Sequence, residues 1–307
     1  MKCLKPIPLY VDLPDEDGVV TLRRINVPCG HCEACYHNRS LEWQVRIMEE
    51  VRDSEKCCFF TLTYDDDHLP MSYGSDYNGP NVLFANFSYS DIKGFVKRLR
   101  DRIKPFKIKF FITPEFGPNT LRPHYHGIIF NHPFRLDKFD EILNDCWKKG
   151  FTSVSPITPA RIPYVAKYVN SFSCLPSWYP RPRIIASRRP AVGIGYLSRL
   201  DRIKWHKENL INYYVSDDGY KYPLPRYYAR KIFSPEELLM LRLQAEEYNE
   251  IESEREKQLR ACLTWSKDLE RCSEALDELH YYIGEDLKKV RQFKKNFYKK
   301  TKKRKDI

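Results

Sequence analysis

A hairpin of two short strands near the middle of the chain constrains its fold more than any other feature. Residues 107–113 and 122–130 are rich in aromatic and β-branched side chains, and each run has the length of one strand. Between them lies the segment 116–119, where Gly, Pro and Asn are typical of a tight turn. The pattern therefore predicts two antiparallel strands that are neighbours in one sheet.

The segments beside this hairpin complete an α+β unit over residues 57–175. The expected elements are a strand over residues 57–64, a helix capped by Ser90 and closed by Pro105, a helix over 137–149 stopped by Gly150, and a strand over 151–157. Together with the hairpin they give the order βαββαβ of ferredoxin-like or RRM-like antiparallel sheets. Such a fold buries both helices on one face, and we expect the other face to be available for a ligand.

Three further segments flank this unit. Residues 1–56 form an extension with a cysteine cluster and a short helix. Residues 176–230 are rich in Pro, Arg and Tyr and are expected to be irregular. Residues 231–307 are expected to form a helical region that starts at Ser234 as N-cap and ends in a basic run.

The strongest candidate for a functional site is His124-Tyr125-His126 in the second hairpin strand. Residues i and i+2 of a strand point to the same face, so the two imidazoles lie together. The hairpin returns the Glu115 carboxylate to the same end of the sheet. Two imidazoles, one carboxylate and open positions suit Mg²⁺ or Mn²⁺ bound also to substrate phosphate, rather than a closed zinc site. The alternative is a strand decorated with histidines beside a solvated turn glutamate.

A second candidate site is a pair of tyrosines later in the chain. Pro163 suits the first position of a helix, which places Tyr164 and Tyr168 one turn apart on one face. Lys167 borders that face, where its ammonium would favour a phenolate or neutralise a phosphate. Tyrosine pairs are more often packing, but the neighbouring metal motif favours nucleophiles.

A cysteine cluster near the start of the chain is a possible second metal site. Cys29, Cys32 and Cys35 offer three thiolates, and a tetrahedral zinc ion needs a fourth ligand. The residues that qualify are His31, His37, Cys3, Cys57 and Cys58. An iron–sulfur cluster is disfavoured because its motif needs a cysteine where Arg39 stands. Zinc and reduced structural thiols both stay open.

Composition points to a nucleic-acid partner. The net charge of +11, the pI near 9.0 and the 14% aromatic content favour binding of a polyanion whose bases stack. Arg39, Trp43 and Arg46 follow helical spacing and form one stripe, which either contacts the DNA backbone or packs internally. Arg122, next to the histidine motif, joins these candidate DNA contacts.

These motifs resemble the HUH endonucleases, and among them the replication initiators of the Microviridae, most of all the gokushoviruses. Residues 59–64 resemble the family's first motif, Glu115 with residues 124–126 its metal motif, and residues 164–168 its two-tyrosine motif. The cysteine segment 29–35 resembles the gokushovirus amino-terminal signature. The resemblance spans roughly residues 29–230 and departs where Pro-Glu-Phe-Gly replaces Gly-Glu-Tyr-Gly around Glu115.

The resemblance implies a rolling-circle replication initiator. Such an enzyme nicks the viral plus-strand origin through a 5′-phosphotyrosine and later rejoins the displaced strand into a circle, acting on viral single-stranded and replicative-form DNA. No Gly-x₄-Gly-Lys-Ser/Thr motif is found in the sequence, so a host helicase and a host polymerase are expected partners. The alternatives are an HUH transposase or relaxase, and a non-catalytic zinc-dependent DNA-binding protein.

The expected location is the cytoplasm of the bacterial host. The sequence holds no run of 18 or more apolar residues and no secretory signal pattern, so no membrane association is expected. A reducing cytoplasm would also keep the ten cysteines as thiols or metal ligands.

Overall fold

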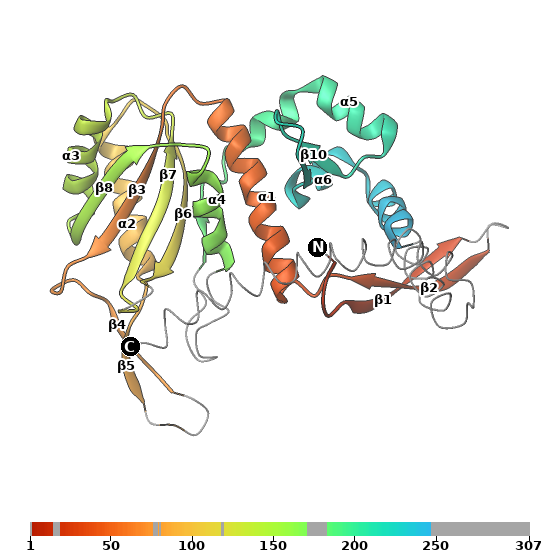
Figure 1. Cartoon of the computed structure of the whole chain (residues 1–307), viewed down its shortest axis with the longest axis horizontal. Coiled ribbons are helices and arrows are strands. Elements are labelled where there is room, and N and C mark those ends of the chain that lie inside the picture. The colour runs from red at the N-terminus through yellow and green to blue at the C-terminus, as the bar shows by residue number, and fades with distance from the viewer. Residues whose placement is uncertain are drawn as a thin grey trace, which may run out of the picture. The chain divides into compact units, whose positions relative to one another are not determined.

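The hairpin expected from the sequence lies at the centre of a five-stranded antiparallel sheet (Figure 1). In the computed structural model, the strand order is β8-β3-β7-β6-β9, and each neighbouring pair is antiparallel. These strands are β3 (Cys57–Tyr64), β6 (Lys109–Phe116), β7 (Pro123–Phe130), β8 (Gly150–Pro156) and β9 (Ile185–Ala186). With helices α2 (Tyr89–Arg102) and α3 (Leu136–Trp147), they reproduce the expected order of strands and helices. A mixed fold with an antiparallel sheet is thereby confirmed.

The structure describes residues 2–14, 19–75, 79, 81–117, 120–170 and 183–246. Residues 1–6 and 28–234 form one compact unit, and residues 7–27 with 235–307 form the other. The segment boundaries expected after residues 56, 175 and 230 stay predictions. No helix in the described ranges is long and apolar enough to cross a membrane.

Two helix ends differ from expectation. The N-cap of α2 is Ser88 rather than Ser90, because the Asp91 N–H donates to Ser88 Oγ. Lys148, with φ 57°, ends α3, whereas Gly150 already begins β8 with φ +135°. A Cβ on Gly150 would lie 2.3 Å from the Thr63 carbonyl oxygen. The glycine is therefore needed where β8 approaches β3, and it is not the helix stop.

The second face of the sheet is not bare, contrary to expectation. Helices α2 and α3 cover one face, where Phe60, Leu62 and Tyr125 belong to their apolar cluster. The opposite face packs against α1 (Glu33–Arg52) and α4 (Arg161–Lys167), as Figure 1 shows. The odd-numbered positions Phe59 and Phe111, with Ile128, point to these helices and carry apolar side chains that need cover.

The segment expected to be irregular instead contains regular elements in its described part. These are η2 (Ile194–Ser198), α5 (Leu200–Asn209), β10 (Tyr213–Val215), β11 (Lys221–Pro223) and α6 (Arg226–Ile232). Two buried carboxylates of α1 hold this region. Glu50 accepts hydrogen bonds from Lys109 Nζ and the Gly193 N–H, while Glu49 binds Arg199 and accepts from Tyr214 Oη. Sequence periodicity misses these elements because they are short and are stabilised by such long-range contacts.

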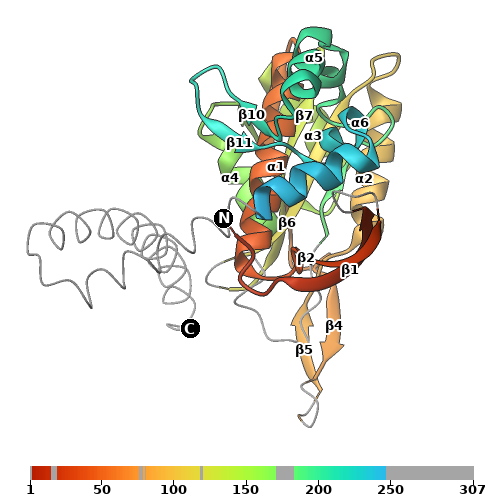
Figure 2. The same cartoon turned by 90° about the vertical axis from the view of Figure 1, so that its right-hand side faces the viewer.

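Two further hairpins lie outside the sheet. β4 (Met71–Gly74) pairs with β5 (Val82–Ala85), and this hairpin projects from the sheet unit in Figures 1 and 2. In the other unit, β1 (Ile7–Pro14) pairs with β2 (Val20–Val27). Residues 235–246 are helical, as expected after Ser234, and the remainder of the predicted C-terminal helix with its basic run lies outside the described residues.

Gly127 in β7 has no room for a side chain, which makes it a test of the central packing. A Cβ there would lie 2.5 Å from the Phe60 ring and 2.9 Å from the Phe111 carbonyl oxygen. We expect Gly127→Ala to lower the free energy of unfolding by about 1–3 kcal/mol, the usual cost of overpacking. Urea denaturation monitored by circular dichroism measures this change.

Gly94→Ala in α2 is the matched control. A Cβ on Gly94 would meet only the flexible end of Arg98 at 3.0 Å, and alanine stabilises a helix interior. The control should leave the free energy of unfolding unchanged or raise it by up to about 1 kcal/mol. Equal losses in both variants would contradict tight packing at Gly127.

Candidate metal and nucleophile site

The hairpin register brings the three candidate metal ligands together. Glu115 on β6 is the register partner of His124 on β7, and His126 follows two residues later on the same face. The Glu115 Oε2 atom lies 3.3 Å from His124 Nε2 and 3.0 Å from His126 Nε2. One ligand atom from each residue lies within 4.8 Å of the other two. This spacing suits one shared ion.

The second ring nitrogen of each histidine is held by the protein. His124 Nδ1–H donates to the Arg122 carbonyl oxygen at 3.1 Å, because a carbonyl only accepts. In neutral His124 the Nε2 lone pair therefore faces the Glu115 carboxylate, and two acceptors that face one another call for a cation between them. His126 Nδ1 is hydrogen-bonded to Thr61 Oγ1 at 3.0 Å. Such support is typical of metal-binding histidines.

The protonation states of the triad also fit a metal site. Burial acts to raise the pKa of Glu115, but hydrogen bonds from His124 and His126 outweigh it and lower the pKa to about 2. Burial lowers the pKa of His126, although Glu115 opposes that shift. At neutral pH the carboxylate is therefore charged and the His126 ring is neutral, which are the forms that bind metal ions.

Both candidate tyrosines contact the histidine side of this triad. The His126 ring centroid lies 5.7 Å from that of Tyr164 and 5.1 Å from that of Tyr168. The two tyrosine rings are 5.0 Å apart, and Lys167 Nζ lies 4.1 Å from the Tyr164 centroid and 4.8 Å from the Tyr168 centroid. The predicted grouping of metal ligands, phenols and ammonium is thus present in one place.

The tyrosine helix begins earlier than expected. α4 starts at Arg161, so Pro163 is its third residue rather than its first, and Tyr168 belongs to the 3₁₀ turn η1 (Tyr168–Asn170). Proline is tolerated there because the first helical N–H groups have no partner within the helix. Ser40 of α1 fixes the helix by donating to the Ala166 carbonyl oxygen at 2.8 Å.

The two phenols differ in environment. Tyr168 is only 5% exposed, whereas Tyr164 is half-buried. Burial raises the pKa of Tyr168, and the charge of Glu115 adds to that rise. Tyr164 is therefore the more accessible of the two hydroxyls to an incoming strand.

The candidate DNA contacts divide between different environments. Arg39 is exposed on α1. The Arg46 guanidinium lies over the rings of Trp43 and Tyr227, at 4.2 and 4.5 Å from their centroids, and donates to the Val192 carbonyl oxygen. Trp43 and Arg46 thus have the internal packing that the sequence left open, and both also line a pocket.

Arg122 is likewise held by protein groups. Its guanidinium donates to the Tyr64 carbonyl oxygen at 2.7 Å and to the Asp66 carboxylate at 2.7 Å. These bonds connect the start of β7 to the end of β3. They place Arg122 beside the metal ligands in the chain, but its donors are already engaged.

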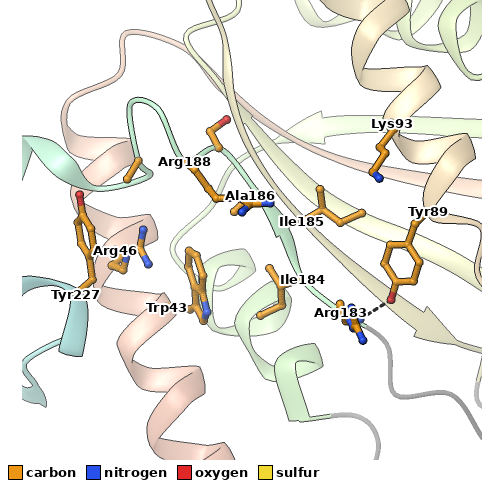
Figure 3. A pocket seen from close by; sticks show the side chains of 12 residues that line it. Trp43, Arg46, Tyr89, Lys93, Arg183, Ile184, Ile185, Ala186, Arg188 and Tyr227 are labelled. Atoms are coloured by element: carbon orange, nitrogen blue, oxygen red, sulfur yellow. Dashed lines mark hydrogen bonds between the residues drawn. The ribbon is translucent and has the colours of Figure 1, made fainter.

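The pocket shown in Figure 3 was not expected from the sequence. It has a volume of about 790 Å³ and lies at the β9 edge of the sheet, between α1 and α2. Its lining combines the rings of Trp43, Tyr89 and Tyr227 with cationic side chains and contains no carboxylate among the described residues. The cations are Arg46, Lys93, Arg183 and Arg188. Sequence reasoning missed it because its walls come from segments that lie far apart along the chain.

Thr61 is a second residue whose role the sequence did not reveal. It lies in the first motif, but only the register of β3 against β7 pairs it with His126. The four cysteines Cys3, Cys29, Cys32 and Cys35 also form a group within 4.8 Å, which we consider below.

Comparison with known proteins supports the resemblance. Residues 57–173 match the model of the replication-associated protein ORF2 family. Replication-associated protein ORF4 of Chlamydia phage 1 is 29% identical over 257 residues, which cover 73% of this chain but only 59% of that protein. Replication-associated protein VP4 of Bdellovibrio phage phiMH2K is 26% identical over 260 residues, or 74% of this chain and 76% of that protein. The resemblance to the gokushovirus replication-associated proteins is therefore confirmed.

One solved structure is a distant neighbour. The N-terminal nuclease domain of the minute virus of mice non-structural protein 1 aligns with a TM-score of 0.19 and 9% identity, over 52% of this chain and 82% of that chain. A score this low supports no conclusion about fold or chemistry.

Proposed function

We propose that this chain is an HUH-type initiator of rolling-circle DNA replication, which nicks a viral origin and rejoins the displaced strand. The observation that carries the proposal is the contact of Tyr164 and Tyr168 with His126, itself 3.0 Å from Glu115. A metal-ligand triad next to two phenols has the parts needed for phosphodiester transfer to tyrosine. The match to phage replication-associated proteins supports the same function.

Glu115, His124 and His126 would hold the metal ion. When bound there, Mg²⁺ or Mn²⁺ would supply a positive charge to the scissile phosphate. Tyr164 or Tyr168 would attack the phosphorus through its hydroxyl oxygen. The bond from phosphorus to the 3′ oxygen breaks, the phenol proton ends on the released 3′-OH, and the 5′ phosphate stays on the tyrosine.

Rejoining would be the same exchange in reverse. A 3′-OH attacks the phosphotyrosine, a phosphodiester forms and the phenol is released with its proton. Because one phosphoester replaces another, no nucleotide cofactor is required. With two phenols 5.0 Å apart, one would hold a strand while the other cleaves the regenerated origin. Lys167, above both rings, would offset the phosphate charge.

Viral single-stranded and replicative-form DNA would be the substrates, and the released 3′-OH would prime a host polymerase after a host helicase has opened the duplex. The action would take place in the cytoplasm of the bacterial host. The test is incubation with a labelled single-stranded origin oligonucleotide and Mg²⁺ or Mn²⁺, followed by denaturing electrophoresis. A covalent adduct is expected. DNA binding without any adduct would favour a non-catalytic DNA-binding protein, and transfer to a non-origin target a transposase or relaxase.

The pocket in Figure 3 would hold part of the bound strand. Ala186 in its wall pairs with Phe111 of β6, and Glu115 lies four residues further along β6, about 14 Å away at strand spacing. Aromatic rings and cations without carboxylates suit a base and its phosphate. Lys93, Arg183 and Arg188 are exposed and would contact phosphates, whereas Arg46 would orient the rings.

Replacing these three exposed cations by Ala should weaken binding of single-stranded DNA and reduce its salt dependence. Each lost phosphate contact lowers the slope of log K against log salt by about 0.7, so the triple change should lower it by about 2. Fluorescence anisotropy across a salt series measures the slope. The control changes three exposed lysines elsewhere, Lys104, Lys138 and Lys204. Equal slopes for both triple variants would exclude the pocket from the DNA path.

A further inference from the structure

We propose that Cys3, Cys29, Cys32 and Cys35 bind one structural zinc ion, and that Cys3 is the ligand that completes the site. These four thiols come from two segments separated by more than twenty residues, and they form a group apart from the metal triad on the sheet. The site is independent of the proposed nuclease chemistry. It would take a soft divalent cation, since all four ligands are sulfur.

The spacing of the sulfurs matches a tetrahedral ion. Cys3 Sγ lies 3.5 Å from Cys29 Sγ and 3.7 Å from Cys32 Sγ, and Cys29 Sγ lies 3.9 Å from Cys35 Sγ. Four sulfurs at about 2.3 Å from a zinc ion are about 3.8 Å from one another in a regular tetrahedron. A disulfide would need about 2.05 Å, and all four residues are free thiols.

The backbone around the cluster is arranged to support negative charge on sulfur. The Cys29 N–H donates to Cys3 Sγ and the Cys32 N–H donates to Cys29 Sγ, both at 3.3 Å. Gly30 between them has φ +80°, which lets the chain turn around the site. Cys32 is the N-cap of α1 and Cys35 lies in its first turn, where the helix dipole favours thiolates.

The structure selects the fourth ligand from the five residues that the sequence allowed. Cys57 and Cys58 lie on β3, and His31 is exposed with Nδ1 hydrogen-bonded to the Cys29 carbonyl oxygen. Within the described residues, Cys3 is the only candidate whose ligand atom groups with the three cysteines. Its sulfur would close the coordination sphere, as in structural rather than catalytic zinc sites.

The physical consequence is a crosslink between the chain's beginning and α1. Residue 3 would be tied to the first turn of α1, and the same helix contacts the tyrosine helix through Ser40 and Ala166. Zinc would thus stabilise the start of a helix that supports the proposed nucleophiles, without touching them. Removing it should lower the thermal stability of the chain more than its metal-triad chemistry.

The first test is metal analysis of the full chain, purified without added metal or chelator. Plasma mass spectrometry should find one zinc and no stoichiometric iron per chain. Replacement by Co²⁺ should give the visible absorption of a tetrahedral tetrathiolate. A chain without zinc, or one with iron in its place, would overturn the proposal. This measurement on the unaltered chain does not depend on the folding of any variant.

Variants then test the ligand assignment. Cys3→Ser should release zinc to a chromogenic chelator at least tenfold faster than the unaltered chain, while His31→Ala and Cys57→Ser should release it at the original rate. Retention of zinc by Cys3→Ser, as tight as in the unaltered chain, would exclude Cys3 as a ligand. Glu115→Gln should keep its zinc even though it loses DNA adduct formation. The two metal sites, and the two proposals, can therefore fail separately.

Discussion

The double variant Tyr164→Phe/Tyr168→Phe is expected to lose covalent capture of an origin oligonucleotide by at least about 1,000-fold, the scale of losing a catalytic nucleophile. Phenylalanine keeps both rings, which pack against His126 at 5.7 and 5.1 Å, and removes only the hydroxyls. Folding and DNA affinity should therefore be preserved. Denaturing electrophoresis of the labelled adduct measures the loss, and anisotropy checks that DNA still binds.

Single variants should separate the two roles. Tyr164→Phe should impair the first cleavage more than Tyr168→Phe, because Tyr164 is half-buried while Tyr168 is 5% exposed. Each single variant should still nick but should fail to circularise a displaced strand, since one phenol holds the strand while the other cleaves. Tyr213→Phe, a half-buried tyrosine on β10, is the control and should behave like the unaltered chain. An adduct from the double variant at the original level would refute tyrosine attack.

Loss of the metal ligands is the second change with a large expected effect. Glu115→Gln or His126→Ala should reduce adduct formation at least about 100-fold, because the charge stabilisation supplied by a bound ion contributes several kcal/mol. Both side chains meet within 3.0 Å, so either change opens the proposed coordination shell. EDTA should reproduce the effect on the unaltered chain, and added Mn²⁺ or Mg²⁺ should reverse it. Isothermal titration with Mn²⁺ measures the site directly.

Thr61→Val should produce a graded version of this defect. It removes the hydrogen bond to His126 Nδ1 while keeping the shape of the side chain, and such supporting contacts are worth about 10–100-fold in metal affinity. High Mn²⁺ should restore its activity, whereas Glu115→Gln should stay inactive. His68→Ala, at an exposed histidine paired with Asp65, serves as the control. If Glu115→Gln and His68→Ala formed equal amounts of adduct, the triad would have no part in the reaction.

Local sequence patterns predicted the sheet unit well because its elements are long and periodic. The first strand matches β3 at both ends, and α2 differs from expectation only near its cap. The misjudged positions are those where a distant segment decides. Gly150 looks like a helix stop, but contact with Thr63 of β3 requires it. The cover on the second sheet face by α1 and α4 could not be read from the order βαββαβ alone.

The candidate site shows the same division. Spacing along two strands was enough to group Glu115, His124 and His126, because hairpin geometry is local. The distance of that triad from the tyrosines depends on how α4 packs, and α4 is positioned by Ser40 of α1. The pocket at β9 and the part played by Thr61 depend on strand register, which residues distant in sequence determine together.

By itself the sequence determined which residues carry the chemistry: a His-x-His strand, a glutamate across the hairpin, paired tyrosines and three spaced cysteines. Their types and short spacings are local properties of the chain. The tertiary structure alone decided which of these meet. It brought Tyr164 and Tyr168 to His126, gave Tyr164 the more open position, and placed Cys3 beside Cys29. The physical reason is that burial and long-range packing set these positions, and neither can be read from local spacing.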